Sequence, residues 1–121
     1  MWSTGGDNME NLDHMLEGLV LELRRGALIL SVLSQLFDKE YGYSLISKLK
    51  DKGFSVEAGT LYPLLRRLEK QEILESSWDL VENRPRRYYQ VSSMGKQLFK
   101  QLKREYLDLN QVINNLLESE D

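Results

Sequence analysis

Apolar residues recur at helical spacing through the first third of the chain, in two consecutive runs. The first run starts at Met9 and follows residues 1–8, a stretch without periodicity that we expect to be disordered or frayed, with Asp7 as a candidate N-cap. The second run, residues 27–37, is apolar nearly all round, which favours a helix at the centre of the fold. Between the runs, residues 24–26 mark either a kink or the junction of two helices.

Two shorter helices are predicted next. The first covers residues 43–50 and ends near Gly53, and the second runs to about Gln71 with Ser55 as a candidate N-cap. The apolar stripe of the second helix consists of Leu61, Leu64, Leu65 and Leu68. Two short helices joined by a tight turn after a buried helix are typical of a helix-turn-helix.

The second short helix contains two residues that form helices poorly. Gly59 and Pro63 are less favourable than alanine in a helix interior by about 1 and 3 kcal/mol. If Thr60 rather than Ser55 is the effective N-cap, Pro63 falls in the first turn, where its missing N–H matters little. Gly59 would then lie just outside the helix, where the lack of a side chain would let a phosphate approach the backbone.

The pattern changes to that of strands and then returns to a long helix. Residues 73–80 and 87–91 are rich in β-branched and aromatic residues and predict a two-stranded hairpin, with Asn83 and Pro85 in a polar loop between them. Ser92 or Ser93 can then cap a helix of about 25 residues, or about 37 Å.

The apolar stripe of this last helix continues almost to its end. About ten such side chains would contribute on the order of 15 kcal/mol if buried, before entropy is counted. A single chain would leave part of the stripe in water, so we expect it to pair with a second copy, with the first helix as the other contact surface. The expected dimer interface consists of Leu12, Leu16, Leu19, Leu98, Leu102, Tyr106, Leu109, Ile113 and Leu116.

Composition adds few constraints to this pattern. A chain of 121 residues with 41% hydrophobic and 29% charged residues fits one globular fold. We divide it into a domain of helix-turn-helix and hairpin with its N-terminal dimer-contacting helix over residues 9–91, and a dimerisation helix over residues 92–121. No apolar run is long enough to cross a bilayer, no secretion signal is recognisable, and there is no cysteine, so we expect a cytoplasmic protein without membrane partners.

No group of residues in the sequence makes a catalytic site. His14 is the sole histidine and has no second imidazole or cysteine with which to share a metal. The pair Gly5-Gly6 lacks the lysine pattern of a nucleotide-binding loop, and Glu69 and Glu72 are one helical turn apart like many surface pairs. We therefore expect no enzyme, no metal and no cofactor; a small enzyme would have to act with carboxylates alone.

Charge is distributed unevenly along the chain. The net charge is −3, yet residues 41–104 hold thirteen basic residues against seven acidic ones. Some of the basic residues lie on the polar side of the second short helix and others in the hairpin, the two elements with which a winged helix contacts the major groove and the adjacent backbone or minor groove. Taken alone, each basic group would equally fit a solvated turn or a solvent face with local ion pairs.

Several strings resemble the PadR family of bacterial transcription regulators. They are RGAL at 25–28, GYSL at 42–45, GTLYP at 59–63, LRRLEK at 65–70, SW at 77–78 and RRYY at 86–89. The match spans about residues 23–117, and the single C-terminal helix is similar to the small-subunit branch of that family. One departure is Gln71-Glu72, where such proteins often have a glycine at the end of the recognition helix.

The resemblance implies a mainly α (α+β) winged helix-turn-helix with a two-stranded wing, acting as a homodimeric repressor that a small molecule releases from a pseudo-palindromic operator in double-stranded DNA. It also implies that Thr60 and Tyr62 face DNA, that Tyr43 touches the backbone, and that wing arginines bind phosphate or the minor groove. The full set of expected DNA-binding residues is Tyr43, Ser55, Thr60, Tyr62, Arg66, Arg67, Lys70, Arg84, Arg86 and Arg87.

Two alternatives remain open at this point. Small members of the family sense aromatic compounds between subunits, for which Phe99 and Tyr106 are candidates here, although both would equally fit an ordinary dimer core. The acidic net charge also leaves room for a dimeric winged-helix interaction module that does not bind DNA.

Overall fold

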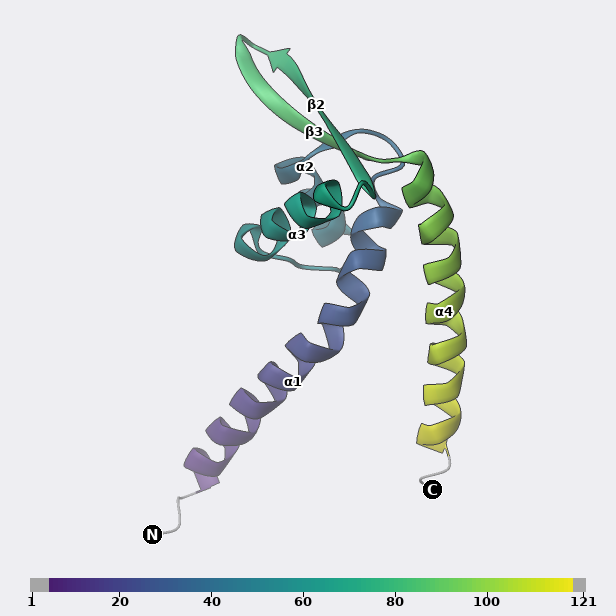
Figure 1. Cartoon of the computed structure of the whole chain (residues 1–121). Coiled ribbons are helices and arrows are strands. Elements are labelled where there is room, and N and C mark those ends of the chain that lie inside the picture. Colours follow the sequence, from purple (N-terminus) through teal and green to yellow (C-terminus); the bar gives the residue numbers. More distant parts are fainter. Residues whose placement is uncertain (1–4, 119–121) are drawn as a thin grey trace.

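Two long helices extend from a small body made of two short helices and a sheet (Figure 1). The computed structural model describes residues 5–118. Its elements are α1 (Gly5–Ser34), β1 (Glu40–Tyr41), α2 (Gly42–Asp51), α3 (Ala58–Lys70), β2 (Leu74–Val81), β3 (Arg84–Val91) and α4 (Ser93–Glu118). The predicted mainly helical winged helix-turn-helix is confirmed, with one strand more than expected.

Helix α1 runs without a break through residues 24–26, so the two predicted apolar runs belong to one helix of 30 residues. It also includes residues 5–8, which were expected to be frayed, and Asp7 therefore lies inside the helix rather than at its N-cap. The first four residues of that expected segment lie outside the described part. Gly26 lowers the helix propensity by about 1 kcal/mol, but burial of the helix beyond it outweighs this local effect.

The core lies where the end of α1 meets α2, α3 and the start of β2. The largest fully buried side chains are Val32, Leu33, Leu36, Leu45, Leu61, Leu65, Leu68 and Leu74. Each such side chain contributes roughly 1.5–3 kcal/mol by leaving water. The predicted stripe of α3 therefore fixes this helix to the body and leaves its opposite side exposed.

The antiparallel sheet has the strand order β1-β3-β2, and the unpredicted strand β1 pairs Glu40 with Tyr89 and Tyr41 with Tyr88. The hairpin turn is shorter than expected, because Glu82 and Asn83 occupy it with φ of 53° and 65°, the left-handed values that a type I′ turn requires. Pro85 consequently lies within β3 and does not stiffen the tip.

A tight junction joins the end of α3 to the start of α4. Glu72 adopts φ of 64°, and the N–H of Ile73 donates to the carbonyl of Leu68 at 2.9 Å, so a non-glycine residue takes the left-handed position after the helix. The Ser92 hydroxyl donates to the Glu72 carbonyl at 2.7 Å and accepts from the Gly95 N–H at 2.9 Å. Ser92 is therefore the cap of α4, and it holds that helix against the turn.

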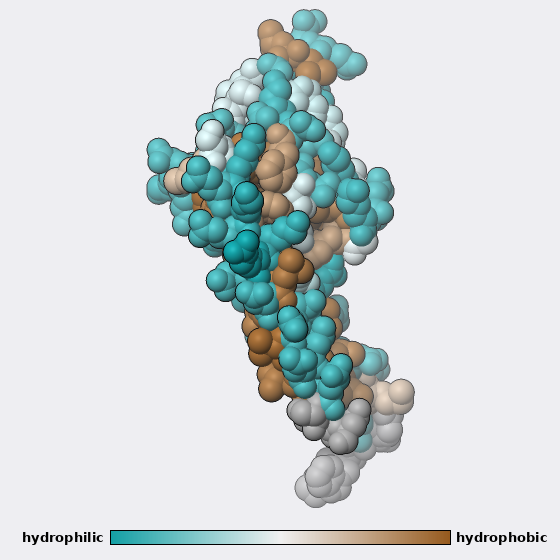
Figure 2. Space-filling view, turned by 90° about the vertical axis from the view of Figure 1, so that its right-hand side faces the viewer, coloured by the Kyte–Doolittle hydropathy of each residue, from teal (hydrophilic) through white to brown (hydrophobic). Residues whose placement is uncertain are grey.

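We call the hairpin of β2 and β3 the wing. The two long helices diverge as they leave the sheet, and their far ends lie opposite the wing (Figure 1). Apolar surface, brown in Figure 2, gathers over this two-helix end of the molecule. Between Gly5 and Glu118, no helix is both long and apolar enough to cross a membrane.

Candidate nucleic-acid interface

The outward face of α3 is a ridge opposite its buried leucines. Gly59, Pro63, Arg66 and Lys70 follow one another at steps of four, three and four residues, and all are exposed. We call these four residues the outer ridge. Thr60 and Arg67 are exposed on one flank of the ridge, and Tyr62 and Glu69 are half-buried on the other flank.

The start of α3 differs from both sequence-based alternatives. The N-cap position is Glu57, whose carbonyl accepts the N–H groups of Thr60 at 3.0 Å and Leu61 at 2.9 Å, and no side chain caps the helix. Ser55 is exposed in the preceding loop, and Thr60 is the third residue of the helix. Pro63 therefore lies in the second turn, and Gly59 lies within the helix rather than just before it.

Three glycines differ in what a side chain would meet. A Cβ at Gly42 would overlap the ring of Tyr62, and one at Gly95 would overlap the carbonyl of Ile73, so both positions need glycine for internal packing. A Cβ at Gly59 would have nothing within 4 Å. The fold itself gives no packing reason for glycine on the outer ridge.

Tyrosine rings form a stack between the start of α2 and the wing. The ring centroids of Tyr43 and Tyr41 are 5.3 Å apart and those of Tyr41 and Tyr88 are 4.2 Å apart, in stacked geometry, and the hydroxyls of Tyr41 and Tyr88 are hydrogen-bonded. This hydrogen bond, together with partial burial, raises the pKa of Tyr41 above its ordinary value. We call Tyr41, Tyr43 and Tyr88 the tyrosine stack.

Two residues of the stack, Tyr41 and Tyr43, line a cleft of about 300 Å³ that separates α2 from the wing. The residues that line the cleft are Tyr41, Gly42, Tyr43, Tyr62, Pro85, Arg86, Arg87 and Tyr89. The cleft thus brings together four expected contact residues from three elements: Tyr43 of α2, Tyr62 of α3, and Arg86 and Arg87 of β3.

Arg86 and Arg87 were predicted together, but the structure gives them different surroundings. The Arg87 guanidinium lies 2.6 Å from a carboxylate oxygen of Glu69 and 3.2 Å from the Ser76 hydroxyl, so it ties the wing to α3. Its Nε is buried without a partner. Arg86 points to the other face of the sheet, because neighbouring strand residues alternate.

The Glu69 carboxylate is held by this contact. The Ser76 hydroxyl donates a hydrogen bond to it, and this bond, with the Arg87 guanidinium, lowers the pKa of Glu69 although partial burial acts in the opposite direction. In the sequence, Glu69 stands out only as one of a pair of surface carboxylates, and nothing there assigns a role to Tyr41 or Tyr88. Their roles depend on strand register, and the alternation within RRYY was the only signal that could have indicated them.

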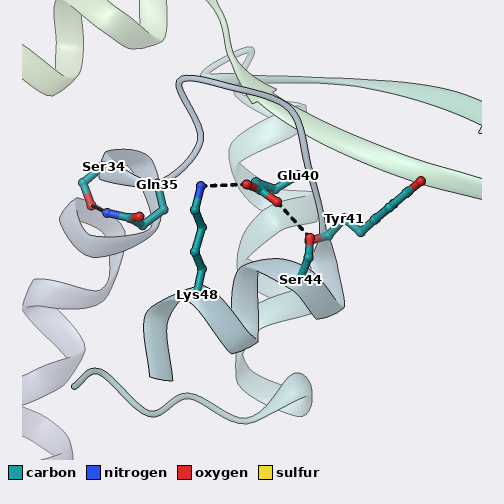
Figure 3. A network of polar contacts seen from close by, with 6 residues as sticks. All are labelled: Ser34, Gln35, Glu40, Tyr41, Ser44 and Lys48. Carbon is teal, nitrogen blue, oxygen red and sulfur yellow. Dashed lines mark hydrogen bonds and ion pairs between the residues drawn. The ribbon is translucent and has the colours of Figure 1, made fainter. Parts of the chain in front are cut away.

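A polar network anchors β1 to α2 (Figure 3). The Lys48 ammonium lies 2.7 Å from one Glu40 carboxylate oxygen, and the Ser44 hydroxyl donates to the other at 2.9 Å. Burial would raise the pKa of Glu40, but these two hydrogen bonds outweigh it and lower the pKa. The network fixes the strand residue next to Tyr41.

The remaining predicted residues lie at the two-helix end. Phe99 is half-buried, with its ring edge-to-face against Phe37 at 5.2 Å, and Tyr106 is exposed. Neither lines the cleft described above. The residues of the expected dimer interface line α1 and α4, and apart from the half-buried Leu102 all are exposed in this single chain.

Acidic residues and His14 do not gather into a metal site. No group of three or more potential metal-ligating side chains occurs within the described residues. The α3 and wing surface offers guanidinium, ammonium and phenol groups, which bind phosphate and base edges, beside exposed carboxylates at Glu75, Asp79 and Glu82.

Comparison with known proteins gives a consistent set of relatives. The model of the transcriptional regulator PadR-like family matches residues 29–101. The transcriptional regulator Rv3488 of Mycobacterium tuberculosis is 38% identical over 76 residues, which are 62% of this chain and 71% of that protein. An uncharacterized protein of Lysinibacillus sphaericus is 30% identical over 102 residues, 80% of this chain and 94% of its own.

Solved structures agree with these sequence matches. The crystal structure of a PadR family transcriptional regulator from Eggerthella lenta is similar with a TM-score of 0.85 and 42% identity, over 90% of this chain and 97% of that one. A PadR-like transcriptional regulator from Bacillus cereus aligns with a TM-score of 0.71 and 29% identity, over 79% of this chain and 96% of its own.

Proposed function

Because the chain belongs to the PadR-like family of transcriptional regulators, which are not enzymes, we propose that it represses transcription by binding double-stranded DNA as a homodimer. The outer ridge of α3 enters the major groove, and the wing contacts the adjacent backbone or minor groove. We place this activity in the cytoplasm.

One observation carries the proposal. Five basic side chains of α3 and β3 make no ion pair with any described carboxylate, whereas Lys39, Lys48 and Arg87 each have a partner within 4 Å. The five are Arg66, Arg67, Lys70, Arg84 and Arg86. Cations without counter-charges on one convex helix and its neighbouring hairpin fit a polyanion, despite the net charge of −3.

The proposed contact set follows from these positions. Thr60, Tyr62 and the three basic residues of α3 face the groove, with Ser55 in the loop before it. Tyr43, Arg84 and Arg86 contact the backbone. Arg87 takes a positioning role instead, since its guanidinium is held by Glu69.

A second copy is the proposed partner of the two-helix end. Leu109, Ile113 and Leu116 of α4 are 58%, 41% and 62% exposed, and Leu12 and Leu16 of α1 are 61% and 57% exposed. A two-fold axis that covers these faces would present two α3 helices to half-sites about 10 base pairs apart on a pseudo-palindromic operator. A small aromatic effector bound near Tyr106 would act on this dimer. Phe99 is less available for that role because it packs on Phe37.

The proposal is tested by fluorescence anisotropy with a labelled duplex from the chain's own promoter region. We expect Arg84→Ala to weaken binding to all sequences and to lower the slope of log affinity against log salt by about one, because one phosphate contact is lost. Lys100→Ala, an equal loss of charge on α4, is the control and should leave the slope unchanged. Tyr62→Ala should lose most of the affinity.

The rival function, a dimeric interaction module, predicts the opposite result. No binding of either the promoter duplex or a random duplex at micromolar protein and low salt would favour it. It draws support from the acidic net charge alone.

A further inference from the structure

Arg86 differs from the other four unpaired cations of α3 and β3 because its guanidinium lies over two aromatic rings. The guanidinium carbon lies 5.1 Å from the ring centroid of Tyr43 and 5.7 Å from that of Tyr41. Asp79 faces Arg86 across the strands, yet its ion-pair partner is Lys39 at 3.7 Å. Arg86 is thus held in place while its charge stays without a carboxylate.

The rings that hold Arg86 are themselves fixed by the fold. Tyr41 lies opposite Tyr88 in the short ladder of β1 and β3, and their hydroxyls are hydrogen-bonded. The ammonium of Lys39 lies over the outer face of this arrangement, 4.9 Å from the ring centroid of Tyr88. The Glu40 network described above anchors the strand residue before Tyr41 to α2.

We propose that the tyrosine stack is a positioning device for Arg86, which holds its guanidinium at the mouth of the cleft between α2 and the wing to bind one phosphate of the DNA backbone. The inference rests on the proposed function and deepens it. Tyr41 contributes to binding by positioning Arg86, and Tyr88 contributes by positioning Tyr41.

The chemistry favours a phosphate over a base edge. Ring faces bind a guanidinium without using its five N–H donors, so the donors stay available to phosphate oxygens. An arginine fixed in advance loses less side-chain freedom on binding than a free one, and this preorganisation strengthens the contact. The cleft is lined by Tyr43 and Tyr62, whose phenol groups add donors beside the guanidinium.

The test compares four variants with the wild-type dimer in DNA titrations over a range of salt concentrations. Arg86→Ala should lower the salt slope by about 0.9, the value for one phosphate contact. Tyr41→Leu should reproduce most of this decrease, and Tyr41→Phe, which keeps the ring, should retain the wild-type slope. The double variant Tyr41→Leu with Arg86→Ala should match Arg86→Ala alone.

A second measurement does not require DNA. NMR relaxation of the Arg86 side-chain Nε–H in the free protein should show increased mobility in Tyr41→Leu and no change in Tyr41→Phe. If Tyr41→Leu does not fold, Tyr88→Leu replaces it, because Tyr88 stacks on Tyr41, whereas the rings near the Arg86 guanidinium are those of Tyr41 and Tyr43.

The outcomes separate the two proposals. If the wild-type protein binds no duplex, the proposed function fails and the inference fails with it. If the wild type binds and Arg86→Ala lowers the slope, but Tyr41→Leu leaves both the slope and the Arg86 mobility unchanged, only the inference is overturned. Additive losses in the double variant would also overturn it.

Discussion

The two ends of this molecule expose opposite kinds of surface. The end formed by α3 and the wing exposes cations that no described carboxylate pairs with, on a helix whose leucines are fully used in the core. The end formed by α1 and α4 exposes leucines, valines and an isoleucine along two diverging helices. The first end lacks counter-charges for its cations, and the second end lacks apolar cover for its hydrophobic side chains.

The type of interaction that a surface lacks within the chain therefore indicates the kind of partner that the surface binds. Unpaired guanidinium groups favour a polyanion, whose contacts weaken with salt. Uncovered apolar stripes favour a second protein chain, whose contacts salt affects little. The two ends should therefore respond differently to the same kinds of change, and four predictions make this specific.

The largest effect is expected from a charge placed in the apolar face of α4. Ile113→Glu should convert a dimer to a monomer, because a carboxylate cannot be buried there without a partner. Affinity for a two-half-site operator should fall by on the order of 100-fold or more as bivalent binding is lost. Analytical ultracentrifugation and anisotropy would measure the two changes.

The matched control lies at the other end. Leu80 is 75% exposed on the wing, and Leu80→Glu adds the same charge there. This variant should keep the wild-type mass. If Ile113→Glu also keeps the wild-type mass, α1 and α4 do not form the dimer interface.

A smaller effect is expected on the outer ridge. Gly59→Ala should stabilise the free protein by up to about 1 kcal/mol, because alanine favours a helix and its Cβ meets nothing within 4 Å. The same change should weaken DNA binding by about tenfold, the equivalent of roughly 1.4 kcal/mol, if the duplex approaches the backbone there.

Gly59→Ala should raise stability and lower DNA affinity, and these opposite effects make it a sensitive test of the outer ridge. Thermal unfolding and anisotropy on the same preparation would measure both. Increased stability with undiminished affinity for Gly59→Ala, or full affinity for Gly59→Val, would show that DNA does not approach this residue.

The ion pair that fixes the wing should respond to pH. Because the folded protein lowers the pKa of Glu69 below its ordinary value of 4.5, the pair stabilises the fold above that pH, and the stabilisation is lost as the pH falls through the folded pKa. Glu69→Gln should therefore unfold more easily at neutral pH, by about 1 kcal/mol or less, and the difference should disappear in acid.

Chemical denaturation at several pH values would measure this effect. Glu75→Gln on the same hairpin is the control, since Glu75 makes no ion pair with any residue that the structure describes, and it should show little pH-dependent difference. A deficit of Glu69→Gln that persists in acid would mean that packing, not charge, joins the wing to α3.

The smallest effect is expected at the junction between the two ends. Glu72 holds a left-handed backbone conformation that glycine adopts more readily. Glu72→Gly should therefore stabilise the protein by up to about 1 kcal/mol. DNA affinity should stay the same, because the residue faces neither partner surface. A loss of stability in urea denaturation would show that the Glu72 side chain supports the turn.

The sequence predicted most of the architecture because periodicity reports burial directly. The stripe of α3, the hairpin, the long last helix and a serine cap at Ser92 or Ser93 all follow from residue types at fixed spacing, and the structure selects Ser92. The continuity of α1 through Gly26 stayed open in the sequence, since a local glycine effect of about 1 kcal/mol competes with burial that only the fold reveals.

Features that depend on register were harder to predict. Strand β1 has two residues, too few for any alternation to be visible. Arg86 and Arg87 look alike in the sequence. They lie on opposite faces of the sheet, so that Arg86 contacts the rings of the tyrosine stack and Arg87 pairs with Glu69. The start of α3 at Glu57 has no side-chain cap, so no residue type marks it.

The junction at Ser92 would give the proposed dimer a mechanical property. Its hydrogen bonds, and the close approach of Gly95 to Ile73, attach the base of α4 directly to the end of α3. Helix α4 has 26 residues and is a lever about 39 Å long. In a dimer joined along the two α4 helices, a few degrees of rotation between these helices would shift the two outer ridges by several ångströms. The angle between the two α4 helices would therefore set the spacing of the half-sites that the dimer can bind.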